Sequence, residues 1–213
     1  MSSKTENQAR DQMVLHGHSL HARGYVPGSS GNLSVRLSDG ILVTPTNSCL
    51  GRLDPARISK LDLDGHHVTG DPPSKEGFLH LQMYRSRPDM KAVAHLHSTY
   101  AVALSCCDGL NPKNVLPAMT PYQVMKTGEV PLLPYFPPGD PGLANAVGTM
   151  AQAHHAILLA NHGPVIGGKN LDIAVYAIEE LEESARLHFV LEGRDTRPLN
   201  ASQVAELKRR FPS

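Results

Sequence analysis

The chain has 213 residues, 40% of them hydrophobic and 19% charged, which is enough to fold around a core of its own. Lysine plus arginine and aspartate plus glutamate each total 20, so the net charge is zero. That balance argues against general nucleic-acid binding, which needs a basic face, although it leaves room for a small basic pocket.

The cysteines and the N-terminal segment favour a reducing compartment. The three cysteines are odd in number, Cys106 and Cys107 are adjacent, and no CxxC spacing occurs. Residues 1–10 are polar and lack the apolar centre of a signal peptide. No apolar run approaches the ~20 residues of a membrane span. We therefore expect a soluble, cytoplasmic protein.

The first third of the chain predicts a helix followed by two hairpins. Gly24 is a suitable helix end, and Asp39-Gly40 is typical of a two-residue hairpin turn. Ser74 is a good N-cap for the next helix. In chain order, the predicted elements are a helix at 5–23, strands at 33–37 and 41–44, a short helix at 57–60, a hairpin over 61–68 and a helix at 75–86.

The remainder predicts further alternation of helices with apolar strands. The elements are a strand at 92–97, a helix at 98–107, mostly loop at 108–140 with a strand near 130–133, a helix at 142–154, strands at 156–160 and 165–166, and helices at 171–191 and 201–210. Interleaved helices and hairpins predict a layered α/β fold around one largely antiparallel sheet. No repeat or linker divides the chain, so residues 1–213 are expected to form one domain.

Three histidines could share one metal ion. His95 and His97 lie two apart on a predicted strand, so both imidazoles face the same way. His162 follows another apolar strand, and Gly163 would let the backbone turn tightly beside it. Three neutral imidazoles suit zinc and leave a position open for water or substrate. Hydrogen-bonded structural histidines are the alternative; His80, on a predicted helix, could pack against the same site.

Residues around Glu76 could bind an anion. Ser74 and Lys75 add a hydroxyl and a positive charge at a predicted helix N-terminus, where free amides and the helix dipole favour anions. Two loops of small and polar residues, at 28–32 and 44–47, could complete a phosphate pocket. Glu76 itself could be a fourth metal ligand, a general base, or a first-turn glutamate that only favours the helix dipole.

Five motifs then point to a known family. They are SGNLSVR at 30–36, TPT at 44–46, PSKE at 73–76, HLH at 95–97 and NHG at 161–163. In this order, and spread over nearly the whole chain, they resemble the class II aldolase/adducin family. The resemblance implies an α/β/α layered fold with a mainly antiparallel central sheet. It also implies a homotetramer with active sites between subunits, and a small phosphorylated substrate.

Site residues follow from the resemblance position by position. His95, His97 and His162 are implied as zinc ligands, with Mn²⁺ or Co²⁺ as alternative metals. Glu76 is implied as the acid/base residue that can also touch the metal, and Tyr122 as a second catalytic residue. The implied substrate- and phosphate-binding residues are Gly31, Asn32, Thr46, Asn47, Ser74 and Lys75.

Departures from the aldolase pattern indicate a subfamily. The sugar-phosphate aldolases have Thr-Gly at Thr46-Asn47 and a second serine at Lys75. Residues 200–213 lack the tail tyrosine of fuculose-phosphate aldolase, and Tyr122 is displaced by one position from that enzyme's other tyrosine. The motifs SKEGFLH at 74–80, HLHSTY at 95–100, PPGD at 137–140 and EELEE at 179–183 resemble the 3-oxo-tetronate 4-phosphate decarboxylases.

The subfamily resemblance implies a carboxy-lyase reaction. Decarboxylation of a 3-oxo-tetronate 4-phosphate would give dihydroxyacetone phosphate and carbon dioxide through a zinc-stabilised enediolate. A class II aldolase acting on fuculose or rhamnulose phosphate would form the same enediolate by releasing an aldehyde. A pentulose-phosphate epimerase is a third alternative. A non-catalytic adducin-like scaffold is the least favoured, because such a scaffold would be expected to lose metal ligands that are all present here.

Overall fold

The structure, a computed structural model, describes residues 3–137 and 139–211. Within these residues eight strands form one sheet in the order β4-β3-β2-β1-β5-β8-β7-β6. Every neighbouring pair is antiparallel except β6 and β7, which confirms a mainly antiparallel sheet. The strands are β1 (Asn32–Arg36), β2 (Ile41–Val43), β3 (Ser59–Leu61), β4 (His67–Thr69), β5 (Ala92–His95), β6 (Leu132–Leu133), β7 (Ala156–Leu159) and β8 (Gly163–Gly168).

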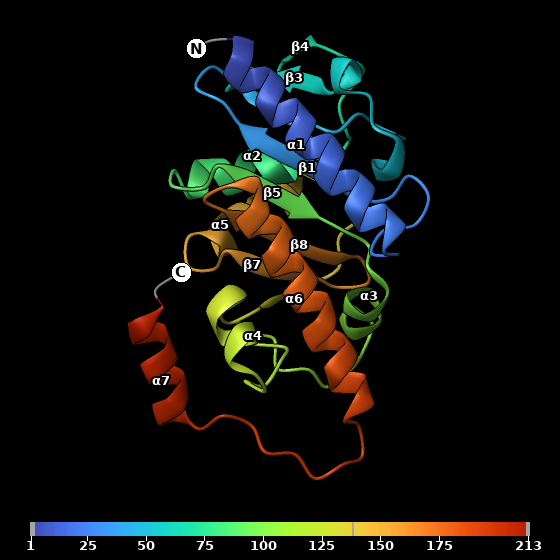
Figure 1. The fold of residues 1–213 in the computed structure, drawn as a ribbon. Coiled ribbons are helices and arrows are strands. Elements are labelled where there is room, and N and C mark those ends of the chain that lie inside the picture. Colours follow the sequence, from blue (N-terminus) through green and yellow to red (C-terminus); the bar gives the residue numbers. More distant parts are fainter. Residues whose placement is uncertain (1–2, 138, 212–213) are drawn as a thin grey trace.

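Helices cover both faces of the sheet, as the layered prediction requires. Figure 1 shows α1 and α6 crossing the near face. Side chains of α1, α3 and α6 share one core with the sheet, and those of α2 and α5 share the other. The helices are α1 (Ser3–Ala22), α2 (Gly77–Ser86), α3 (Thr99–Ser105), α4 (Pro121–Lys126), α5 (Pro141–Ala151), α6 (Leu171–Val190) and α7 (Ala201–Arg210), with 3-10 turns η1 (Leu50–Arg52) and η2 (Pro55–Arg57).

Strand alternation decides which side chains face which layer. On β5, Ala92 and Ala94 enter the core beneath α1, α3 and α6, whereas Val93 enters the core beneath α2 and α5. His95 is two residues beyond Val93 and therefore points to the α2 side. On β1, Leu33 packs toward α1, so Asn32 on its flank also faces α2. The sheet thus presents its polar strand ends to the start of α2.

Both predicted hairpins are confirmed. In the first, the Leu37 amide donates to the Gly40 carbonyl at 2.8 Å, so the turn is centred on Ser38 and Asp39, one residue earlier than expected. In the second, β3 pairs with β4, and the Asp62 carboxylate accepts three backbone amides of the turn. These local side chain–backbone bonds are what made the turn readable from sequence.

Two predictions about helices were wrong, and the start of a third helix was misplaced. Residues 57–60 are not a short helix, because the helical turn η2 ends at Arg57 and β3 begins at Ser59. The segment 108–140 contains a helix, α4, whose N-cap Thr120 accepts from the Gln123 amide at 3.1 Å. The helix expected from Lys75 begins at Gly77, with Glu76 in the N-cap position. In the PPGD motif at 137–140, Pro138 lies outside the described residues.

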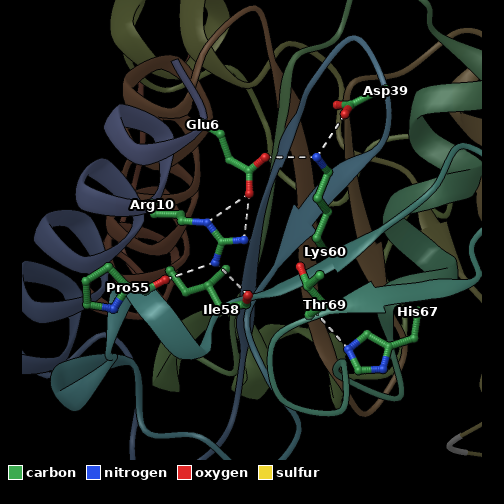
Figure 2. A network of polar contacts seen from close by, with 8 residues as sticks. All are labelled: Glu6, Arg10, Asp39, Pro55, Ile58, Lys60, His67 and Thr69. Carbon is green, nitrogen blue, oxygen red and sulfur yellow. Dashed lines mark hydrogen bonds and ion pairs between the residues drawn. The ribbon is translucent and has the colours of Figure 1, made fainter. Parts of the chain in front are cut away.

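A polar network fixes α1 against the edge of the sheet (Figure 2). Arg10 donates to the carbonyls of Pro55 and Ile58 at 2.9 and 2.7 Å, and the Glu6 carboxylate accepts from Arg10 and from Lys60. Burial alone would raise the pKa of Glu6, but the two cations lower it below its usual value. The network holds α1 against η2 and β3.

The C-terminal helix stands apart from the layered body. Figure 1 shows α7 beside α4, at the end of an extended segment that follows α6. The Leu199 amide donates to the Ala118 carbonyl at 2.7 Å, and Lys208 pairs with Glu129 at 3.0 Å. Among residues 3–137 and 139–211, no helix is both long and apolar enough to cross a membrane.

Candidate metal centre

Three strand ends bring the predicted histidines together. His95 is the last residue of β5, and His97 follows two positions later, just outside the strand. His162 lies in the turn between β7 and β8, and β8 pairs with β5 so that Val165 lies opposite His95. Long-range pairing of β5 with β8 therefore carries the turn to the end of β5.

Gly163 permits this close approach. Its φ is 148°, a backbone conformation that favours glycine, and a Cβ built on it would lie 2.4 Å from the Leu96 carbonyl oxygen. A side chain at this position would have to push the turn away from the β5 end. The glycine therefore determines how near His162 comes to His95 and His97.

Glu76 completes a compact group with the three histidines, named here the His-Glu cluster. His162 Nε2 lies 2.9 Å from one Glu76 carboxylate oxygen, and His95 Nε2 lies 3.4 Å from the other. His95 Nε2 and His97 Nε2 are 3.1 Å apart. The four candidate ligand atoms all lie within 4.8 Å of one another. Two nitrogens bound to one tetrahedral zinc at about 2.0–2.1 Å are roughly 3.4 Å apart, which is close to these separations.

The protonation of His95 also suits a metal. Its Nδ1 lies 2.8 Å from the Pro164 carbonyl oxygen, which can only accept, so Nδ1 carries the hydrogen. The lone pair of Nε2 is then directed into the cluster, as in metal-binding histidines whose other nitrogen is held by a backbone carbonyl. His95 is fully buried, so this orientation is fixed by packing as well as by the hydrogen bond.

Electrostatics make the cluster a place that attracts positive charge. Burial opposes the charged form of His95, but the Glu76 carboxylate raises the pKa of His95 above its usual value. Burial, with help from the neighbouring imidazoles, lowers the pKa of His97 to about 4. Burial would raise the pKa of Glu76, yet His95 and His162 bring it well below its usual range. Three imidazoles and a carboxylate are a donor set that fits Zn²⁺.

The predicted phosphate-binding loops lie side by side near the cluster. The Thr46 amide donates to the Pro72 carbonyl at 2.9 Å, and the Ser74 amide donates to the Thr44 carbonyl at 3.1 Å. Asn32 reaches the cluster directly, since its Nδ2 donates to Glu76 at 2.7 Å. Ser74 Oγ accepts the Glu76 amide at 3.2 Å, so one of its bonds already serves to position Glu76.

A cavity of about 470 Å³ adjoins these loops and contains arginines that the sequence reasoning missed. Thr46 and Asn47 line it, and Asn47 adopts a positive φ of 54° there. Arg52 and Arg57 also line it, and Arg57 pairs with Asp71 at 2.6 Å. Gly31, Ser74 and Lys75 are not among its lining residues. No sequence signal marked Arg52, which is the last residue of the short 3-10 turn η1.

Tyr122 is not brought to the cluster by its own chain in the part that the structure describes. It lies on α4, 61% exposed, with the Lys126 ammonium 5.6 Å from its ring centroid. Lys126 lines a different cavity together with Gly168. Gly168 pairs with Ala92, at the end of β5 that is farther from His95. A role for Tyr122 would therefore require a second copy of the chain.

Glu182 is a further residue that sequence reasoning did not single out by itself. Its two carboxylate oxygens accept the backbone amides of Tyr100 and Ala101, each at 2.8 Å. These are free amides of the first turn of α3, which follows His97 directly. Glu182 therefore ties α6 to the segment that carries His97. The signal was present in the acidic stretch at 179–183, but its partner could be known only after packing.

Fold and site together describe a three-layer α/β protein with three histidines and a carboxylate, a group that could hold a metal ion, at one end of its sheet. The model of the Class II Aldolase and Adducin N-terminal domain matches residues 11–189. The chain belongs to the class II aldolase and adducin family, whose members include metal-dependent aldolases.

Several named proteins are similar to this chain over most of its length. The chain is 51% identical to 3-oxo-tetronate 4-phosphate decarboxylase of Pectobacterium atrosepticum over 207 residues, covering 97% of this chain and 95% of that protein. It is 36% identical to L-fuculose phosphate aldolase of Methanocaldococcus jannaschii, covering 84% of this chain and 94% of that one. The crystal structure of YgbL from Escherichia coli superposes with a TM-score of 0.94 at 49% identity, covering 96% and 99% of the two chains.

Proposed function

We propose that the protein decarboxylates a 3-oxo-tetronate 4-phosphate to dihydroxyacetone phosphate and carbon dioxide. The observation that carries the proposal is the His-Glu cluster beside the phosphate loops. Five relatives between 47% and 51% identical bear the name of this decarboxylase, which supports the same reaction here.

A metal ion would be held by His95, His97 and His162, with Glu76 at its edge. Such an ion, proposed to be zinc with Mn²⁺ or Co²⁺ as alternatives, would act as a Lewis acid that polarises the substrate C3 carbonyl and stabilises the enediolate. The 3-oxo group is β to the carboxylate, so the electron pair released with carbon dioxide can be accepted by this carbonyl.

Glu76 would handle the proton that the reaction needs at C2. Because its pKa lies below the usual range, Glu76 meets the substrate as a carboxylate and must take up a proton before it can act as an acid. The C2 hydroxyl, beside the polarised carbonyl, is a suitable donor. Glu76 would then return that proton to carbon C2 after carbon dioxide leaves, and solvent would reprotonate the oxygen. The balance is one proton consumed for each carbon dioxide released.

The substrate phosphate would lie among the loops that carry Asn32, Thr46 and Ser74. Amides and hydroxyls of small residues form this kind of anion-binding concavity. Lys75 is exposed in the turn just before α2 and could hold either the phosphate or the C1 carboxylate. Gly31 and Asn47 are proposed to complete the pocket, since positive φ values let their backbone approach a ligand closely.

The second candidate is a class II aldolase that releases an aldehyde from a sugar phosphate. Relatives named L-fuculose phosphate aldolase, between 34% and 36% identical, favour keeping it. Lys75 in place of a serine and the absence of tyrosine from residues 200–213 favour decarboxylation.

We also propose a homotetramer, in which Tyr122 of one subunit would face the His-Glu cluster of another.

The test is to incubate the zinc-loaded protein separately with the erythronate- and threonate-derived 3-oxo-tetronate 4-phosphates and with L-fuculose 1-phosphate. Dihydroxyacetone phosphate and carbon dioxide should appear in equal amounts from at least one sugar-acid substrate. Dihydroxyacetone phosphate from fuculose phosphate alone, together with lactaldehyde, would favour the aldolase. Release of neither product from the sugar acids would refute the decarboxylase.

A further inference from the structure

A line of buried polar side chains runs away from Glu76 between β1 and α2. On β1, Asn32 and Ser34 are two apart and both face α2; on α2, His80 and Tyr84 are four apart and both face β1. Two strand residues advance about 6.7 Å and four helix residues about 6.0 Å, so the two rows stay in step. Each of these residues on β1 therefore lies beside its hydrogen-bonding partner on α2.

Every member of this line is hydrogen-bonded to the next. Tyr84 OH and Ser34 Oγ are 2.7 Å apart, and Ser34 Oγ and His80 Nδ1 are 2.6 Å apart. His80 Nε2 contacts Asn32 Oδ1, and Asn32 Nδ2 donates to Glu76 at 2.7 Å. The four side chains between Glu76 and the protein interior are each 3% exposed or less. No water is needed to connect them, so the chain of bonds is direct.

The direction of every bond follows from the charge on Glu76. An ionised carboxylate only accepts, so Asn32 must turn its NH₂ toward Glu76 and its oxygen toward His80. His80 must then carry its hydrogen on Nε2 and accept on Nδ1. Ser34 must donate to that Nδ1, which leaves its oxygen to accept from Tyr84. One arrangement of hydrogens satisfies all four contacts.

His80 and Tyr84, the two α2 residues of the line, keep the protonation states that this arrangement requires. Burial lowers the pKa of His80 to about 3, so the ring stays neutral as the arrangement requires. Burial raises the pKa of Tyr84 above its usual value, so its hydroxyl remains a donor. Arg36, two residues beyond Ser34 on β1, donates to the Tyr84 carbonyl at 3.1 Å.

We propose that His80 is a positioning residue: with Ser34 and Tyr84 it fixes which end of the Asn32 amide faces Glu76. If His80 were absent, the Asn32 oxygen would lose its buried partner and the amide could rotate. A rotated amide would set its oxygen against the Glu76 carboxylate, where the structure has a donating NH₂ group. Partners one step beyond metal-site residues commonly matter in this way.

The line orients groups and does not conduct protons. Asn32 stands between His80 and Glu76, and an amide nitrogen at neutral pH gives up its hydrogen far too reluctantly to relay one. The proton that Glu76 exchanges must therefore travel through substrate or solvent. His80 differs in this respect from an imidazole placed directly on a reacting group.

Neutron diffraction from the metal-loaded protein, grown in deuterated solvent, tests the arrangement without any assay of activity. We expect deuterium on His80 Nε2 and none on Nδ1, with the Asn32 ND₂ group directed at Glu76. Deuterium on His80 Nδ1, or an Asn32 oxygen facing Glu76, would overturn the proposal. This readout stands even if the proposed decarboxylation fails; only the kinetic test below rests on that function.

Variants then separate positioning from mere support of the fold. His80→Phe should lower kcat per bound metal ion by about 10–100-fold while each chain still binds one ion. His80→Gln, which keeps a donor toward Asn32, should recover part of the loss, and Tyr84→Phe should cost less than His80→Phe. Leu79→Val, buried on the same helix, is the control for destabilised packing. A kcat in His80→Phe and His80→Gln equal to that of the control would refute the role.

Discussion

Replacing Glu76 by glutamine tests the proposed chemistry most directly. The side chain keeps its volume but loses its charge and its ability to take up and return a proton. In the structure the carboxylate accepts from Asn32 at 2.7 Å and meets His162 at 2.9 Å. A glutamine keeps an acceptor oxygen at only one of these two positions, because an NH₂ group takes the place of the other oxygen.

The expected loss follows from the role. Proton transfer by a positioned side chain contributes about 10²–10⁴-fold to a rate, which corresponds to about 3–5.5 kcal/mol of activation free energy. Glu76→Gln should therefore lower kcat by at least about 100-fold. The three imidazoles remain, so the variant should still bind one metal ion per chain. The effect should thus appear in turnover and not in metal content.

The assay couples dihydroxyacetone phosphate to NADH oxidation through glycerol-3-phosphate dehydrogenase, with zinc measured by atomic emission on the same sample. Glu183→Gln, which removes one charge from an exposed ion pair with Arg186, is the matched control. A Glu76→Gln enzyme that binds one zinc and keeps kcat within about threefold of the control would refute the acid/base role. Loss of zinc with loss of turnover would instead make Glu76 primarily a ligand.

Two further predictions concern stability. Gly163→Ala places a Cβ 2.4 Å from the Leu96 carbonyl oxygen and should lower Tm by roughly 4–8 °C and weaken zinc binding. Gly148→Ala is the control, because its Cβ would meet only side-chain atoms of Gln82 and Ser86, at 3.2 Å or more. Equal Tm values would contradict the reasoning. Below pH 6.5 the unfolded chain takes up a proton at His80 that the folded chain refuses until about pH 3, so stability falls on acidification across this range. Urea unfolding in EDTA at pH 7.5 and 5.0 should show a smaller loss of unfolding free energy for His80→Phe than for the unmodified protein. Equal losses would exclude His80 as a source of the pH dependence.

Sequence reasoning worked best where the signal was local. The alternation of side chains along a strand placed His95 and His97 on one side of the sheet, and the Asn-His-Gly turn placed His162 at a strand end. Hairpin turns were readable because Asp and Gly satisfy local backbone requirements. The order of the motifs then identified the family. These features depend on residues only a few positions apart.

Errors arose where local preference was ambiguous. Ser74 is a good N-cap, yet the helix begins at Gly77, because Ser74 Oγ bonds to the Glu76 amide in a turn that precedes the helix. The Thr120-Pro121 pair is an equally good helix start, but it was hidden by the prolines and glycines around it. Both cases show that a capping residue predicts that a helix starts nearby, but not the residue at which it starts.

Thus the sequence by itself determined the layered α/β class, the three imidazoles and the acidic residue that accompanies them. Only the tertiary structure decided how these groups act on one another. The pairing of β5 with β8 brings His162 to His95, and the packing of α2 on β1 joins His80 to Asn32 and Asn32 to Glu76. Such contacts join residues more than 40 positions apart, and neither side chain carries a local mark of its distant partner. The orientation of the side chains in the His-Glu cluster depends on those partners, and so it could be read only from the fold.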